Sequence, residues 1–245
     1  MRNGYIAVLD SGIGGLSVLR ELIKIMPNEQ FLYLGDNKNA PYGNKSVQEL
    51  RALAFKSVDE IKRYPVKCLV IGCNTLSVTL LNEIREYSKL ATFGVVPPIN
   101  ESITLGDRVL LLATVRTSQN YKNIKGLTAV GLKGLVKDIE FNMFNARAID
   151  LEKALKDADE NFVKQKGYYN TVILGCTHYV FMKNQIYDYF CPQNIVSGNE
   201  ITAKQVKNYL ENNKLLVRHK QFNILFVGEC AKINGKYFDK SGQIL

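Results

Sequence analysis

Two cysteines stand in matching surroundings and are the residues best placed to do chemistry. Cys73 lies within residues 69–77 and Cys176 within residues 172–180, and both segments follow one order of residue types. A short apolar run comes first, then glycine, then cysteine, then small hydroxyl or amide residues at the start of an expected helix. This order is typical of a buried parallel strand that passes into a helix at the carboxyl edge of a sheet, where open α/β sheets bind ligands. A helix N-terminus there favours negative charge, either of a substrate carboxylate or of the thiolate itself.

Three other roles are open to these two thiols. A free cysteine is most often a small buried hydrophobic residue. Zinc binding would need His178 as a further ligand, but two cysteines and one histidine leave a tetrahedral site one ligand short, and no C-x-x-C pair is present. A disulfide is disfavoured because the chain is expected in a reducing compartment. Placement favours a chemical role for the matched pair, since Cys68, Cys191 and Cys230 lack both the preceding glycine and the polar helix start.

Polar residues near the expected strand ends could assist the thiols. His178, two residues after Cys176, could protonate a substrate group or promote thiol ionisation, although a lone histidine is more often structural. Asp10 opens a glycine-rich turn at residues 10–15 and could either cap a helix or face a ligand. The turn does not match a dinucleotide fingerprint, because Ser17 stands where G-x-G-x-x-G requires its third glycine.

The first part of the chain predicts the elements that position Cys73. Strands are expected at residues 5–9, 30–34, 67–72 and 92–96, and the helices between them end near residues 25, 63 and 88. Ser46, with Glu49 three residues later, predicts a capping box at the start of the second helix. Three successive strand–helix units indicate a parallel sheet with right-handed crossovers.

The pattern starts again after Pro97-Pro98, the clearest boundary in the sequence. Thr114 and Thr117 follow the first strand of this part and would cap a helix by default. Residues 132–150 predict no clear element. The remaining elements are expected as strands at 108–113, 127–131, 171–174, 194–197 and 222–227, and as helices at 151–166, from the second cysteine to about 190, and at 200–212.

The predicted fold class is therefore α/β, with two similar parallel-sheet domains and the active site in the cleft between them. Residues 1–97 plus 213–245 are expected to form the first domain, which carries Cys73. Residues 98–212 are expected to form the second domain, which carries Cys176.

Composition and charge limit the class of protein. The chain has 245 residues, of which 46% are apolar and 22% charged, as in an ordinary globular enzyme. No apolar run of about 18 residues is present, so no membrane partner is expected. The first strand begins too early for a signal peptide, which favours the cytoplasm. The formal net charge of +9 comes from dispersed basic residues, so a solvated surface that attracts an anionic substrate is favoured over a nucleic-acid-binding patch.

Four tripeptides occur together in a characteristic order and spacing: Asp10-Ser11-Gly12, Pro41-Tyr42-Gly43, Cys73-Asn74-Thr75 and Cys176-Thr177-His178. With this combination the chain resembles the glutamate racemase (aspartate/glutamate racemase) family over about residues 5–203. The resemblance implies interconversion of L- and D-glutamate without a cofactor, so neither pyridoxal phosphate nor a metal is expected. It also implies glutamate as the small-molecule partner and a supply of D-glutamate for peptidoglycan. The sequence sets no oligomeric state, and a homodimer is compatible with it.

The resemblance also implies a role for each matched residue. Cys73 and Cys176 would act on opposite faces of the substrate, one as thiolate base and the other as thiol acid, with Asp10 assisting Cys73 and His178 assisting Cys176. The implied substrate-binding residues are Asp10, Ser11, Pro41, Tyr42, Gly43, Asn74, Thr75, Thr117, Thr177 and His178. Glu140 and Thr114 are further candidates. Residues 131–140 are a poor copy of the family stretch that ends in a functional glutamate, and Val180 stands where proline is usual.

Two alternatives stay open. An aspartate or hydantoin racemase would share the cysteine pair, although the opening at residues 10–15 and the pair Asn74-Thr75 favour glutamate. A basic regulatory protein that binds nucleic acid on an inactive racemase scaffold is the alternative from a different class. Its affinity would fall steeply with salt and would not depend on the thiols.

Overall fold

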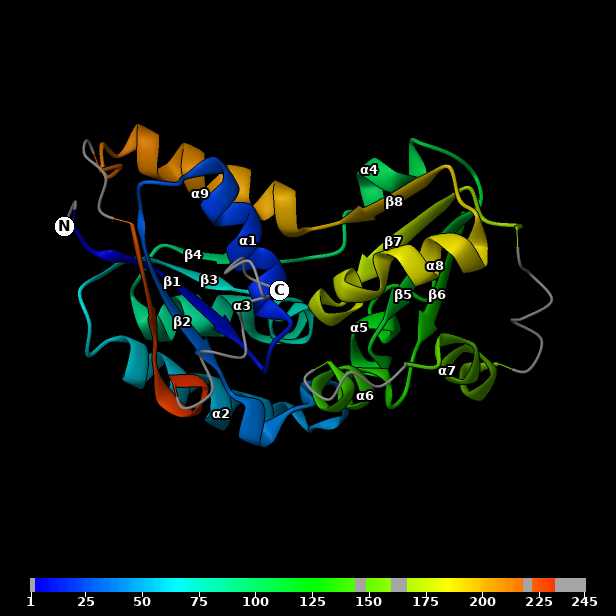
Figure 1. The fold of residues 1–245 in the computed structure, drawn as a ribbon, viewed down its shortest axis with the longest axis horizontal. Coiled ribbons are helices and arrows are strands. Elements are labelled where there is room, and N and C mark those ends of the chain that lie inside the picture. The colour runs from blue at the N-terminus through cyan, green and yellow to red at the C-terminus, as the bar shows by residue number, and fades with distance from the viewer. Residues whose placement is uncertain (1–2, 144–148, 160–166, 218–221, 232–245) are drawn as a thin grey trace. The chain divides into compact units, whose positions relative to one another are not determined.

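The computed structural model describes residues 3–143, 149–159, 167–217 and 222–231. The chain forms two compact units, whose elements are labelled in Figure 1. The first unit combines the chain up to Val95 with the part from Asn199 onward, and the second unit contains Val96–Gly198. No helix in the described ranges is both long enough and apolar enough to cross a bilayer.

The first unit is built on a five-stranded sheet in the order β4-β3-β1-β2-β9, in which all neighbouring strands run parallel. The strands are β1 (Tyr5–Asp10), β2 (Gln30–Gly35), β3 (Val66–Ile71), β4 (Thr92–Gly94) and β9 (Asn223–Phe226). The last five residues of β1, β2 and β3 are all buried. Such continuous burial is expected for a parallel sheet that helices cover on both faces.

Helices cover this sheet in two pairs: α1 (Gly15–Ile25) with α9 (Asn199–Asn212), and α2 (Val47–Ile61) with α3 (Asn74–Ser88). Figure 1 shows the two pairs on opposite faces of the sheet. Ser46 caps α2: its hydroxyl accepts a hydrogen bond from the Glu49 N–H at 3.2 Å, and the Glu49 carboxylate accepts one from the Ser46 N–H at 2.8 Å. The predicted capping box is confirmed.

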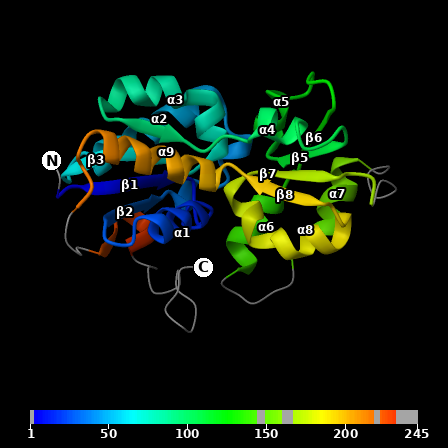
Figure 2. The ribbon, with the colours of Figure 1, turned by 90° about the horizontal axis from the view of Figure 1, so that it is seen from above.

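The second unit is built on a four-stranded parallel sheet in the order β6-β5-β7-β8. Its strands are β5 (Val109–Ala113), β6 (Leu127–Gly131), β7 (Thr171–Gly175) and β8 (Asn194–Ser197). Its helices are α4 (Ile99–Ile103), α5 (Val115–Gln119), α6 (Leu135–Asn142), α7 (Leu151–Ala158), the 3-10 helix η4 (Thr177–Met182) and α8 (Lys183–Phe190). Figure 2 shows α4 and α5 on one side of this sheet and α6 and α8 on the other.

The two sheets share one topology. The order β4-β3-β1-β2 of the first unit matches the order β8-β7-β5-β6 of the second when the strands are numbered within each unit. The prediction of two similar parallel-sheet domains is therefore confirmed. Cys73 follows β3 and Cys176 follows β7, so both cysteines occupy the same position in their own sheets.

Several boundaries differ from those predicted. Helix α9 belongs to the first unit rather than to the second, because it packs along α1 and the Asn199 side-chain amide donates a hydrogen bond to the Ser17 hydroxyl at 2.9 Å. The predicted domain division at residues 98–212 is corrected accordingly. Helices α4 and α6 are short and were not predicted as elements, and of α5 only the capping hydroxyls at its start were predicted. Helix α7 ends at Ala158, and residues 160–166 of the predicted helix lie outside the described residues.

Candidate active site

Cys73 lies between β3 and α3 and occupies the N-cap position of α3. Its side chain is buried and forms no disulfide. The preceding residue, Gly72, is closely packed: a Cβ atom there would lie 3.2 Å from the Cα atom of Gly15 and 3.4 Å from Oδ2 of Asp10. The thiol is therefore held at the carboxyl edge of the sheet, at the positive end of the α3 dipole.

Asp10 is the last residue of β1 and is fully buried. Its Oδ1 atom accepts a hydrogen bond from the Gly12 N–H at 2.8 Å, while Oδ2 faces Gly72. Ser11, the next residue of the turn, is also buried. The carboxylate that was predicted to assist Cys73 thus lies beside the segment that carries this thiol.

Tyr42 begins the short helix η2 (Tyr42–Asn44) and is buried. Its hydroxyl donates a hydrogen bond to Oδ2 of Asp36 at 2.6 Å. Burial, followed by the charge and hydrogen bond of Asp36 and then by the charges of Cys73 and Asp10, raises the pKa of Tyr42 far above its usual range. Tyr42 therefore remains a neutral hydroxyl group near the thiol and the Asp10 carboxylate.

Asn74 and Thr75 form the first turn of α3, and both are buried. The Asn74 amide donates a hydrogen bond to the Val95 carbonyl at 3.1 Å. Its carbonyl oxygen, Oδ1, is buried without a hydrogen-bond partner among the described residues. Because a buried acceptor is costly to leave unsatisfied, this oxygen is a candidate to receive a donor from a ligand. Pro41, half-buried, and Gly43, buried, lie on either side of Tyr42.

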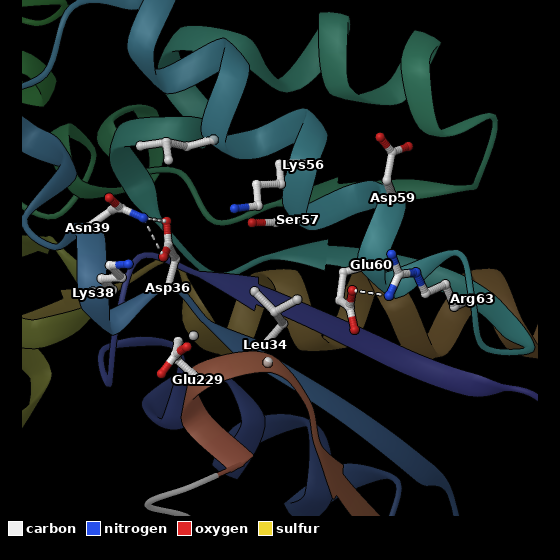
Figure 3. A pocket seen from close by; sticks show the side chains of 13 residues that line it. Leu34, Asp36, Lys38, Asn39, Lys56, Ser57, Asp59, Glu60, Arg63 and Glu229 are labelled. Carbon is white, nitrogen blue, oxygen red and sulfur yellow. Dashed lines mark hydrogen bonds and ion pairs between the residues drawn. The ribbon is translucent and has the colours of Figure 1, made fainter.

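Asp36 is a further residue at this strand edge, and it was not among the predicted site residues. It follows β2, and both of its carboxylate oxygens accept hydrogen bonds from the Asn39 amide, at 2.8 and 3.0 Å (Figure 3). Asp36 also lines a pocket of about 490 Å³ between the end of β2, helix α2 and residues 228–229, which Figure 3 shows from close by. Neither matched cysteine lines that pocket. Its place at the end of a buried strand, like that of Asp10, was the signal that could have identified it.

Cys176 occupies the equivalent position in the second unit, between β7 and η4, and is also buried. Its Sγ atom lies 3.9 Å from Nδ1 of His178. The expected single helix after this cysteine is in fact two consecutive helices: the 3-10 helix η4 runs to Met182, and the α-helix α8 begins only at Lys183.

His178 is buried and connects Cys176 to Glu140 of α6. Its Nε2 atom lies 2.7 Å from Oε1 of Glu140. Burial by itself lowers the pKa of His178, but the hydrogen bonds to Cys176 and Glu140, with the charges of both groups, outweigh it and hold the pKa well above the usual value. The raised pKa favours the protonated form of the His178 imidazole, which lies next to the Cys176 sulfur.

Three threonines complete the predicted residues of the second unit. The Thr114 hydroxyl accepts a hydrogen bond from the Thr117 N–H at 3.3 Å and donates one to the Thr117 hydroxyl at 3.0 Å, so the predicted capping role of Thr114 is confirmed. Thr177 is buried directly after Cys176. Because Ala113 and Gly175 pair across β5 and β7, the residues that follow them, Thr114 and Cys176, leave the sheet side by side.

The other cysteines have different surroundings. Burial raises the pKa of the Cys68 thiol to about 12. Burial also raises the pKa of Cys230, whose thiol donates a hydrogen bond to the Val227 carbonyl at 2.8 Å. Cys191 is exposed at the end of α8. Within the described residues, no group of three or more His, Cys, Asp or Glu side chains is arranged to hold a metal ion.

Comparison with known proteins places this geometry in a family. The sequence pattern of the Asp/Glu/hydantoin racemases matches residues 6–206. The chain belongs to this racemase family. It is 33% identical over 226 residues to the glutamate racemase of Clostridium botulinum strain Okra. The aligned region covers 86% of this chain and 85% of the relative. The enzyme is therefore a racemase, an isomerase.

Solved structures of racemases share the fold. Glutamate racemase from Thermus thermophilus in complex with β-chloro-D-alanine superimposes with a TM-score of 0.78 at 29% identity, over 96% of this chain and 92% of that one. Glutamate racemase from Francisella tularensis in complex with D-glutamate superimposes with a TM-score of 0.75 at 27% identity, over 92% of this chain and 88% of that one.

Proposed function

We propose that this enzyme interconverts L- and D-glutamate without a cofactor, with Cys73 and Cys176 as its two proton-transferring groups. The observation that carries the proposal is the matched placement of two buried thiols, each following the same strand of its own sheet. Asp10 lies beside the glycine that precedes Cys73, and His178 lies 3.9 Å from Cys176. The glutamate racemases among its relatives, one of them solved with D-glutamate, support this choice of substrate.

Inversion of an amino acid requires removal of the α-proton from one face and delivery of a proton to the other. One thiolate takes the α-proton and becomes a thiol, leaving the electron pair on the α-carbon. The opposite thiol then gives its proton to that carbon and becomes a thiolate. No electrons are gained or lost, and the two cysteines exchange roles when the reaction runs in the other direction.

The two thiols are assisted by different groups. On the Cys176 side, the His178 imidazolium stabilises the thiolate by its charge, and Glu140 holds the imidazole ring in place. On the Cys73 side, the α3 N-terminus favours the thiolate. There the neighbouring Asp10 carboxylate can accept a hydrogen bond from the substrate ammonium group or receive a proton from it.

Polar groups near the two thiols suit an amino acid with two carboxylates. Oδ1 of Asn74 can accept a hydrogen bond from the ammonium group, because it has no partner among the described residues. Hydroxyl groups and backbone N–H groups can donate to the carboxylates. We assign this role to Ser11, Gly43, Thr75, Thr117 and Thr177, with Pro41 and Tyr42 shaping the wall beside them. A supply of D-glutamate for peptidoglycan is the corresponding cellular role.

Circular dichroism of the substrate tests this proposal directly. L-Glutamate incubated with the purified protein under reducing conditions, with no added cofactor, should lose its signal, and so should D-glutamate. L-Aspartate under identical conditions is the matched substrate control and should retain its signal. Loss of the aspartate signal with an unchanged glutamate signal would contradict the substrate assignment.

A further inference from the structure

Tyr33 is a buried residue of β2 whose hydroxyl reaches the turn that carries Asp10. The side chain is fully buried, and its hydroxyl donates a hydrogen bond to the Gly12 carbonyl at 2.5 Å. Gly12 is the residue whose N–H donates to Oδ1 of Asp10 at 2.8 Å. Both polar groups of Gly12 are thus engaged, one by Tyr33 and the other by Asp10.

The space around this connection is tight. A Cβ atom on Gly15 would lie 2.6 Å from Cβ of Asp10 and 3.0 Å from the Tyr33 hydroxyl. A Cβ atom on Gly35 would lie 2.5 Å from the Gly12 carbonyl oxygen. Because neighbouring atoms already crowd the turn, the Tyr33 hydroxyl and the Asp10 carboxylate have little freedom to move independently.

Tyr33 is in turn held by the C-terminal strand β9. Tyr33 pairs with Phe226 in the parallel register of β2 and β9, and the two rings pack edge to face at 5.7 Å between centroids. The Tyr33 carbonyl accepts a hydrogen bond from the Val227 N–H at 3.0 Å, and the Cys230 sulfur lies 3.4 Å from the same carbonyl oxygen. A segment nearly 200 residues away in sequence therefore fixes the side chain that reaches the Asp10 turn.

We propose that Tyr33 is a positioning residue for racemisation, which acts through Gly12 to hold the Asp10 carboxylate against Gly72, next to Cys73. This inference rests on the proposed function. Loss of the Tyr33 hydroxyl leaves the Gly12 carbonyl without its donor and allows the turn to relax, and the proton transfer at Cys73 then becomes slower. Transfer at Cys176 is not affected, because the groups proposed to assist that thiol, His178 and Glu140, lie on helices of the other unit.

The variant Tyr33→Phe tests the proposal, because it keeps the ring that packs on Phe226 and removes only the hydroxyl. We expect kcat/KM to fall on the order of tenfold, the effect of one lost buried hydrogen bond. The diagnostic readout is the primary isotope effect on kcat/KM with α-deuterated glutamate, measured from each enantiomer. When one proton transfer is slowed, the isotope effect rises for the enantiomer whose α-proton that step removes and falls for the other.

Two variants calibrate the direction of this change. Asp10→Asn slows the Cys73 side and His178→Asn slows the Cys176 side, so the two should shift the pair of isotope effects in opposite directions. Tyr33→Phe should follow Asp10→Asn. Tyr169→Phe, which removes another buried tyrosine hydroxyl next to Thr128 of the second unit, is the matched control and should leave both isotope effects at the wild-type values.

Unchanged isotope effects in Tyr33→Phe, or a shift like that of His178→Asn, would overturn the positioning role, since a merely structural role lowers the active fraction without altering either isotope effect. The proposed function is judged separately. If the wild-type enzyme racemises glutamate and Tyr33→Phe behaves like Tyr169→Phe, only the role of Tyr33 is lost.

Discussion

At the residue scale, the proposed assistance to Cys176 depends on a histidine whose pKa is raised in the folded chain. The Glu140 carboxylate and the Cys176 sulfur raise the pKa of His178, and burial does not cancel their effect. Glu140 was only a weak match in the sequence, because the residues before it depart from the family pattern. The structure places its carboxylate 2.7 Å from the imidazole, a contact that sequence spacing could not show across 38 residues.

The raised pKa of His178 predicts a pH-dependent stability. A histidine whose pKa is higher in the folded state stabilises the fold fully below its unfolded pKa of about 6.5, and this contribution is lost as the pH rises through the folded pKa. Urea unfolding of the wild type should therefore show a free energy that declines above about pH 6.5. The difference between wild type and His178→Asn should shrink over the same range, and a difference that grows with pH would contradict the charged state of His178.

The cysteines themselves give a second prediction at this scale. Cys73→Ser and Cys176→Ser should each lower the racemisation rate by at least about 10³-fold, because each removes the acid or base on one face. The exposed Cys191→Ser and the buried Cys68→Ser are the controls, and both should retain most of the wild-type rate. The rate is measured by circular dichroism of glutamate. Wild-type activity in either Cys73→Ser or Cys176→Ser would contradict the two-thiol mechanism.

At the element scale, a buried ion pair connects the segment after α9 to the five-stranded sheet of the first unit. The Lys67 ammonium group bonds to the Glu29 carboxylate, and both side chains are almost inaccessible. The Lys67 ammonium group also donates a hydrogen bond to the Leu215 carbonyl at 3.1 Å, and Glu29 accepts one from the Val217 N–H at 3.1 Å. This pair connects three segments that are distant in sequence.

Removal of one partner should therefore be costly. Glu29→Gln should lower the free energy of unfolding by about 3 kcal/mol, because it leaves the Lys67 ammonium group buried without its counter-ion. Urea denaturation measures the change. The exposed pair of Arg51 and Glu83 is the matched control, and Glu83→Gln should leave the free energy of unfolding nearly unchanged. Equal effects of the two substitutions would show that the buried pair has no special role.

The strands were predictable from the sequence because each is a short apolar run between glycine, proline or polar residues. The short helices α4 and α6 were not, since each presents too few turns for a helical period to emerge. The assignment of α9 also failed, because its packing on α1 is a tertiary contact that follows no local pattern. The hydrogen bond of Tyr33 to Gly12 is likewise a tertiary contact, so the sequence indicated Tyr33 only as an apolar residue of a strand.

At the scale of the whole molecule, the repeated strand order explains why the cysteine motifs repeat. In each sheet the equivalent strand, β3 or β7, is followed directly by a cysteine and the start of a helix. One local sequence pattern therefore produces two similarly placed thiols. The groups proposed to assist the thiols are not repeated: Asp10 comes from a strand end, whereas His178 and Glu140 come from helices. The enzyme is therefore expected to be symmetric in topology and asymmetric in its acid–base chemistry.

The central claim is that two thiols act on opposite faces of one substrate, and proton exchange with solvent tests it most directly. Either enantiomer of glutamate is incubated in deuterium oxide, and the α-carbon is examined by mass spectrometry before one turnover is exceeded. Two bases predict almost complete deuterium in the product and little in the recovered substrate, because the thiol that removes the α-proton is not the one that supplies the product. Appreciable transfer of the original α-proton into the first product formed would contradict the two-thiol mechanism.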